Sequence, residues 1–133
     1  MGAKTRILVV DTEPDLRFSV AVTLRQGGYD VGEAGAGRES IEKLLDARQK
    51  GERISLVVAI LRKPGTWLLE LMDELGRCGL AVPMLVIGDS DEKGLRERLE
   101  AWDFTDFIES PSGPEELVAR VALLVNKTDR RAG

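Results

Sequence analysis

Two acids and a threonine follow the first apolar run of the chain, and their side chains are of the type that binds a metal ion. The run Ile7–Val10 is followed directly by Asp11, Thr12 and Glu13. A hard divalent cation prefers oxygen ligands, usually including carboxylates, and it needs several of them. By itself this segment could supply only part of a cation site, and the remaining ligands would have to come from other elements.

Other chemistry is restricted by the residue types that the chain lacks. The sequence has no histidine, so Ser40 cannot form a Ser–His nucleophile. Its single cysteine, Cys78, excludes an internal disulfide and a multi-cysteine zinc site. Gly35 and Gly37 lack the third glycine of a dinucleotide-binding fingerprint, and a tight turn into a helix is the simpler interpretation. We expect neither a catalytic residue nor a cofactor.

Size and charge indicate a single globular domain. The chain has 133 residues, 43% of them hydrophobic, and a formal net charge of −4. This acidity argues against a nucleic-acid surface, which normally has a basic face. No apolar run reaches the length of a membrane span, so we predict a cytoplasmic protein with no membrane partner.

Five apolar runs alternate with five amphipathic stretches. Runs that are apolar throughout predict strands buried on both faces, and strict alternation predicts a doubly wound parallel sheet. The predicted strands are Ile7–Val10, Tyr29–Glu33, Ile54–Ile60, Pro83–Ile87 and Asp106–Ile108. The predicted helices are Pro14–Gln26, Gly37–Lys50, Trp67–Arg77, Asp91–Trp102 and Pro114–Lys127. We expect the domain to span residues 1–127, and residues 128–133 to form a polar tail or the start of a linker.

The order and spacing of several segments resemble the receiver domain of two-component response regulators. Residues 9–14 (VVDTEP) are similar to its acidic opening, and residues 33–40 (EAGAGRES) to the entry into its second helix. Residues 82–87 (VPMLVI) are similar to its fourth strand, and residues 106–111 (DFIESP) to its fifth. The resemblance implies a flavodoxin-like (CheY-like) doubly wound α/β sandwich, with a five-stranded parallel sheet and five helices.

In that family, phosphoryl transfer needs a pair of acids that hold a metal, an acceptor aspartate, a hydroxyl and a lysine. The metal and the lysine neutralise charge on the phosphoryl group. Carried over to this chain, the resemblance keeps only the first acid, Asp11. The other four places are taken by residues without the required group: Thr12 for the second acid, Ile60 for the acceptor, Gly88 for the hydroxyl and Ser110 for the lysine. The implied degenerate phosphorylation pocket consists of Asp11, Thr12, Glu13, Ile60, Gly88 and Ser110. Phe107 takes the place of the family's switch aromatic, and no metal is expected.

Two cations follow the third predicted strand. Arg62 and Lys63 could provide an internal counter-charge for Asp11 or Glu13, because an acid in a crevice is costly without a partner. The alternative is that both are solvated loop charges, which contribute little.

The last predicted helix has more apolar residues than one buried stripe needs. Leu117, Val121 and Leu124 form the core stripe, and a second row is left over. With Phe104, that row makes a candidate partner face consisting of Val118, Ala122, Val125 and Phe104. Scattered surface apolar residues are the alternative.

The sequence therefore predicts a non-enzymatic signalling module that acts by protein–protein interaction, with a partner or as a homodimer, independently of phosphorylation. Two alternatives stay open. One is a phosphorelay receiver with an atypical acceptor, such as Asp11 or Asp89. The other is a small-molecule sensor that uses the degenerate crevice.

Overall fold

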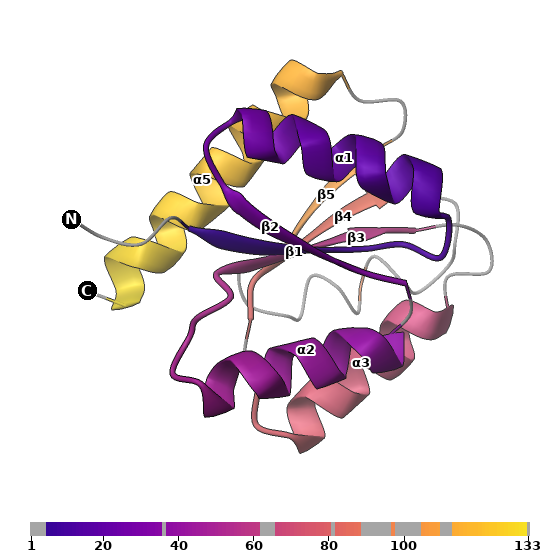
Figure 1. Cartoon of the computed structure of the whole chain (residues 1–133), viewed down its shortest axis with the longest axis vertical. Coiled ribbons are helices and arrows are strands. Elements are labelled where there is room, and N and C mark those ends of the chain that lie inside the picture. The colour runs from indigo at the N-terminus through magenta and orange to yellow at the C-terminus, as the bar shows by residue number, and fades with distance from the viewer. Residues whose placement is uncertain are drawn as a thin grey trace.

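The computed structural model describes residues 5–35, 37–61, 66–80, 82–88, 97, 105–109 and 113–132. Within these ranges the chain forms a parallel five-stranded sheet with helices on both faces (Figure 1). The strands are β1 (Arg6–Val10), β2 (Asp30–Ala34), β3 (Leu56–Ile60), β4 (Met84–Gly88) and β5 (Thr105–Glu109). The helices are α1 (Pro14–Gln26), α2 (Gly37–Gln49), α3 (Thr66–Arg77) and α5 (Pro114–Ala132).

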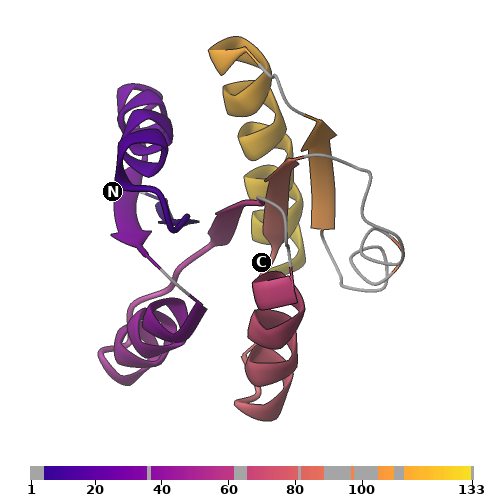
Figure 2. The ribbon, with the colours of Figure 1, turned by 90° about the vertical axis from the view of Figure 1, so that its right-hand side faces the viewer.

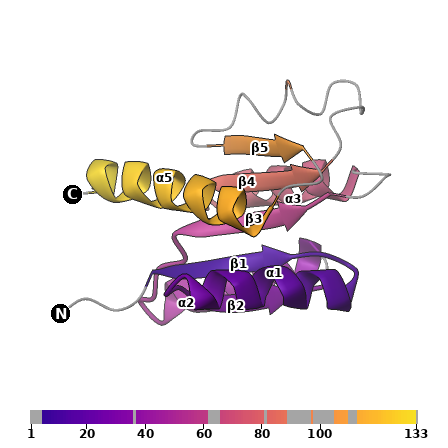
Figure 3. The same cartoon turned by 90° about the horizontal axis from the view of Figure 1, so that it is seen from above.

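The parallel sheet and the alternation of strands and helices confirm the predicted fold. The strand order is β2-β1-β3-β4-β5, and the strand arrows point the same way (Figure 3). The helix predicted over Asp91–Trp102 lies outside the described residues, apart from Glu97, which is helical. The described part of the chain therefore contains four of the five predicted helices.

The end of the last helix differs from the prediction. The sequence predicts that this helix stops at Lys127 and that a polar tail or the start of a linker follows, but helix α5 continues to Ala132. The polar residues 127–132 include no glycine or proline that would end a helix, and arginine is a good helix former. Their polarity is therefore not a sufficient reason to predict a helix end.

The sheet divides the core into two apolar layers. Helices α1 and α5 cover one face, and α2 and α3 cover the other (Figures 1 and 2). In β1, Ile7 and Val9 belong to the α1/α5 layer, whereas Leu8 and Val10 belong to the α2/α3 layer. Successive side chains of a strand point to opposite faces, so a strand that is apolar throughout serves both layers.

The topology also fixes where a site can form. Helices α1 and α2 follow β1 and β2 on opposite faces of the sheet, and the chain order reverses between β1 and β3. In doubly wound folds the crevice for ligands lies at this reversal, outside the carboxyl ends of the strands. Asp11 after β1, Ile60 at the end of β3 and Gly88 at the end of β4 all lie at this edge.

Candidate functional site

Asp11 is buried at the carboxyl end of β1, with 1% of its surface exposed. Its backbone N–H donates to the Ala34 carbonyl (3.1 Å), and its carboxylate Oδ1 accepts the backbone N–H of Glu13 (3.3 Å). Glu13 is the N-cap residue of α1 and its side chain makes no capping hydrogen bond. The Asp11 carboxylate therefore supports the turn into α1, a local role that aspartate often has before a helix.

Ile60 lies beside Asp11 and is part of the core. Val10 pairs with Ala59 across the β1–β3 ladder, so the next residues, Asp11 and Ile60, are neighbours at the edge of the sheet. Ile60 is 4% exposed and belongs to the apolar α1/α5 layer. Its side chain has no polar atom, so this position contributes neither a metal ligand nor a nucleophile.

Gly88 lies in close contact with the residue that follows Ile60. A Cβ atom built at Gly88 would lie 2.9 Å from both the Cβ and the carbonyl oxygen of Leu61. The Leu61 N–H also donates to the Ile87 carbonyl at 2.7 Å, which holds the two strand ends together. The space that a side chain at position 88 would need is therefore occupied by the main chain of Leu61.

Arg17 of α1 connects the segment after β1 to strand β2 at this edge, and the sequence alone does not single it out. Its Nη1 donates to the backbone oxygen of Asp11 (2.8 Å), and its Nε bonds to Oε1 of Glu33 (3.2 Å). Arg25 lies 3.7 Å from the other oxygen of Glu33. A Cβ at Gly35 would come within 3.2 Å of Arg17 Nη1, so the glycine leaves room for the guanidinium group. The signal in the sequence was a cation four residues after the helix N-cap and an acid near the end of β2.

A hydrogen bond orders the entry into α2. The Gly35 N–H donates to Oε2 of Glu39 at 2.8 Å, and Lys43 lies 3.5 Å from the other carboxylate oxygen. The hydrogen bond from Gly35, followed by the charges of Lys43 and Arg17, lowers the pKa of Glu39 below its ordinary value.

Among the described residues, the other predicted pocket positions do not complete a site. Thr12 and Glu13 are exposed. Ser110 and the two loop cations, Arg62 and Lys63, lie outside the described residues, as do Asp89 and Phe104. In the part of the chain that the structure describes, no group of three or more potential metal ligands comes together.

Phe107 lies on β5 opposite Val86 of β4 and packs partly buried against the α2/α3 layer. Next to it, the Asp106 carboxylate receives a hydrogen bond from Arg120 of α5 at 2.8 Å. This ion pair fixes α5 against the edge strand and raises the pKa of Arg120.

The predicted partner face on α5 is wrong at one position. Val125 is 5% exposed and belongs to the α1/α5 layer, because it lies four residues after Val121 on the same side of the helix. Val118 and Ala122 are half-buried. The large apolar side chain that α5 does expose is Leu123, at 58%.

Comparison with known proteins identifies the family. Residues 7–122 match the sequence model of the response regulator receiver domain, so the chain belongs to that family. It is 32% identical over 127 residues to the transcriptional regulatory protein AruR of Pseudomonas aeruginosa, a match that covers 96% of this chain and 52% of AruR. It is 30% identical to ResD of Bacillus subtilis, again over 96% of this chain and 50% of the relative.

Solved structures agree on the fold. A receiver domain protein from Methanospirillum hungatei superposes with a TM-score of 0.81 at 17% identity, covering 97% of this chain and 99% of the other. The chemotaxis protein CheY4 of Vibrio cholerae gives 0.75 at 22% identity, covering 92% of this chain and 99% of CheY4. The flavodoxin-like, CheY-like architecture is therefore confirmed.

Membership places the chain in two-component signalling, where receivers interact with proteins such as kinases and effectors. The chain spans about half the length of the two regulators named above. No helix in the described ranges is both long and apolar enough to cross a membrane.

Proposed function

We propose that this receiver domain signals without taking up a phosphoryl group and acts by binding a protein. The observation that carries the proposal is Ile60, which ends β3 where the family resemblance puts the acceptor aspartate. Its side chain is an apolar part of the core, 4% exposed, and cannot form an acyl phosphate.

The contact at Gly88 supports the same proposal. Ordinary receivers switch when the phosphoryl group draws the hydroxyl at the end of β4 inward, and an aromatic side chain follows. Here Gly88 has no hydroxyl, and Leu61 fills the space for one. Phe107 has no phenolic hydroxyl either. A domain without this trigger transmits a signal only through a partner that binds one of its conformations preferentially.

The retained acid has a local explanation. Asp11 accepts the Glu13 N–H at the start of α1, and this role requires no metal. Its retention therefore agrees with a domain that has lost its phosphoryl chemistry.

The test is the intact mass of the protein after incubation with magnesium and acetyl phosphate. A receiver of established phosphoryl uptake, treated in parallel, shows that the reagent is active. We expect its mass to increase and the mass of this chain to stay unchanged.

A gain of one phosphoryl group on this chain would overturn the proposal and favour an atypical acceptor. Repeating the assay on Asp11→Asn and Asp89→Asn would then locate it, because only the variant that lacks the acceptor loses the gain. If both variants still gained a phosphoryl group, peptide mapping would be needed to find which other carboxylate accepts it.

A further inference from the structure

A groove runs between α2 and α3, on the face of the sheet opposite α1 and α5. Its volume is about 640 Å³. Helix α2 contributes Gly37 and Ile41, and α3 contributes Trp67 and Leu71. The edge with Asp11 and Ile60 contributes no lining residue, so the groove is separate from the degenerate pocket.

The shape of the groove fits a helix. The α3 residues that line it are at position 67, at 70 and 71, at 73 and 74, and at 77. These positions lie about one helical turn apart, so one face of α3 forms a wall. That stretch of α3 is about 15 Å long at 1.5 Å per residue. At one end a Cβ on Gly37 would be 3.7 Å from the Leu71 Cβ, so the helices are in close contact there. A further helix of about three turns would match this length.

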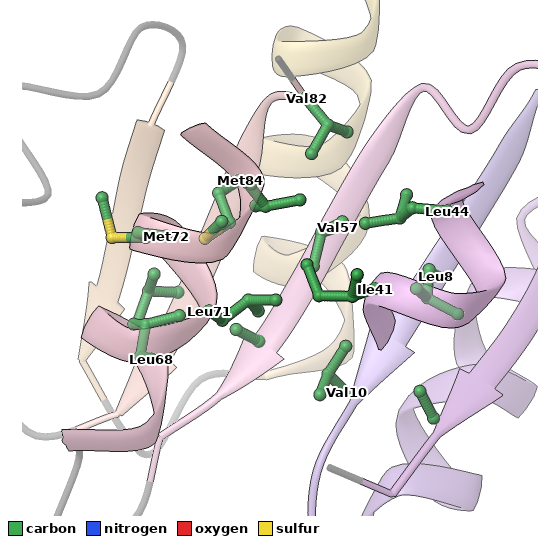
Figure 4. Packing of buried hydrophobic residues seen from close by; sticks show 14 of the residues in the cluster. Leu8, Val10, Ile41, Leu44, Val57, Leu68, Leu71, Met72, Val82 and Met84 are labelled. Atoms are coloured by element: carbon green, nitrogen blue, oxygen red, sulfur yellow. The ribbon is translucent and has the colours of Figure 1, made fainter. Parts of the chain in front are cut away.

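The floor of the groove is apolar. Ile41 and Leu71 are 9% and 2% exposed and belong to the α2/α3 layer, where Figure 4 shows them among its buried side chains. Trp67 is half-buried and packs against the same layer. A partly exposed tryptophan over an apolar floor is the kind of residue that anchors protein interfaces.

The rim is acidic. It carries four carboxylates and two guanidinium groups, which leaves a net charge of −2. Both arginines pair within their own helix: Arg38 lies 3.9 Å from Glu42, and Arg77 lies 3.1 Å from Glu74. The exposed carboxylate of Glu70 on α3 adds to the negative charge of this rim.

We propose that this groove binds a cationic amphipathic helix of a partner protein. Its apolar face would cover Trp67 and the floor, and its lysine or arginine side chains would face the acidic rim of α3. Charge complementarity of this kind adds specificity and a faster association rate. The inference holds whether or not the domain takes up a phosphoryl group, since no groove residue belongs to that pocket.

The test uses a synthetic amphipathic peptide of about 15 residues, built from leucine and lysine at helical spacing. Binding is followed by amide chemical shifts of the isotope-labelled full chain. Two control peptides have glutamate in place of lysine, or the same composition in an order that destroys the apolar face. We expect saturable shifts in α2 and α3 with the first peptide, and at least about tenfold weaker binding of both controls.

Charge-reversal variants locate the site. Glu70 is exposed, so Glu70→Lys should leave the fold intact and weaken binding of the cationic peptide by about tenfold or more. Asp15→Lys makes the same charge change on α1, on the opposite face of the sheet, and should have little effect. Trp67→Leu, which keeps an apolar side chain, should also weaken binding.

Three outcomes would overturn the proposal. The first is the absence of saturable binding, and the second is equal binding of the control peptide whose residue order destroys the apolar face. The third is an equal loss of peptide affinity in Glu70→Lys and Asp15→Lys. Shifts in α2 and α3 that depend on protein concentration without peptide would instead assign the groove to a second copy of the chain.

Discussion

The three residues at the carboxyl edge of the sheet each have a structural role. Asp11 accepts an N–H at the start of α1, Ile60 fills part of the α1/α5 layer, and Gly88 gives room to the main chain of Leu61. Each role is met by the residue type present at that position. In the part of this edge that the structure describes, the end of the core is packed and contains one buried acid, Asp11.

The contact at Gly88 predicts an unfavourable substitution. Gly88→Thr would put a Cβ 2.9 Å from the Leu61 carbonyl oxygen, and main-chain atoms cannot move aside as a flexible side chain can. We expect the free energy of unfolding to fall by roughly 1–3 kcal/mol. Urea denaturation of the two proteins measures the difference.

Gly76 provides the matched control. It lies in α3, is exposed, and has no atom within 4 Å of a Cβ built on it. Gly76→Ala should therefore raise the free energy of unfolding by about 0.5–1 kcal/mol, the helix preference of alanine. If Gly88→Thr were as stable as the native chain, Leu61 would not be packed as described.

Glu39 predicts a pH-dependent contribution to stability. Its pKa is lowered in the folded state, mainly by the Gly35 N–H. The stabilisation is therefore fully present above the ordinary pKa of 4.5 and is lost as the pH falls through the lowered folded value. Because the side chain is exposed, we expect Glu39→Gln to lower the free energy of unfolding by only about 0.5 kcal/mol at pH 7.

Thermal unfolding of the native chain and Glu39→Gln from pH 7 to pH 3 measures this effect. The two melting temperatures should converge at the acid end. Glu42→Gln is the control on the same helix, and a constant gap between Glu39→Gln and the native chain would contradict the assignment.

At this scale the sequence identified residues by their position but not by their contacts. Asp11, Ile60 and Gly88 follow or end apolar runs, so their common edge could be predicted from the order of elements. The hydrogen bond from Arg17 to Asp11 and the approach of Leu61 to Gly88 could not be predicted, since both depend on distances between side chains and main-chain atoms that only the folded structure sets.

Helix α5 shows how a wide apolar surface is divided between core and solvent. Val121, Leu124 and Val125 are at most 5% exposed, whereas Leu123 is 58% exposed. Residues four apart lie on one side of a helix, so Val125 follows Val121 into the core. The apolar pattern of the sequence places residues 118, 122 and 125 in one outer row, but the buried stripe of α5 is wide enough to include Val125.

This division predicts opposite results for two neighbouring apolar residues. Val125→Ala removes buried methyl groups and should lower the free energy of unfolding by about 1–3 kcal/mol. Leu123→Ala should change it by less than about 0.5 kcal/mol, since its side chain is mostly in water. Chemical denaturation of both variants decides the matter, and equal losses would mean that the orientation of α5 is wrong.

The positions of strands and helices could be predicted from the sequence better than which side of each helix is buried. All five strands lie where apolar runs predicted them, and α1 has the predicted bounds, Pro14–Gln26. The strands are marked by apolar runs, and α1 is marked by clear boundary residues. The end of α5 had neither, and the helix continues through residues that the pattern assigned to a tail.

The whole molecule is two apolar layers that share one sheet. In β1, Leu8 faces one layer and Val9 the other, and both are at most 2% exposed. A loss of packing on either side therefore loosens strands that the other side also needs. We expect the domain to unfold as one cooperative unit.

A pair of variants tests this expectation. Leu24→Ala removes packing from the α1/α5 layer and Leu75→Ala from the α2/α3 layer, and both residues are fully buried. Each should lower the free energy of unfolding by about 2–5 kcal/mol. In both, circular dichroism and tryptophan fluorescence should report the same urea midpoint. Separate midpoints would show that the layers unfold independently.

The contact between Gly88 and Leu61 also makes the effects of substitutions depend on one another. A library that varies positions 60 and 88 together would sample acids and hydroxyl residues at the two places, yet a Cβ at position 88 meets the backbone oxygen of Leu61 whatever side chain residue 61 carries. Folded clones with a side chain at position 88 should therefore carry compensating changes in the segment after β3. Epistasis of this kind means that access to a given pair of residues at positions 60 and 88 depends on the order in which the substitutions are made.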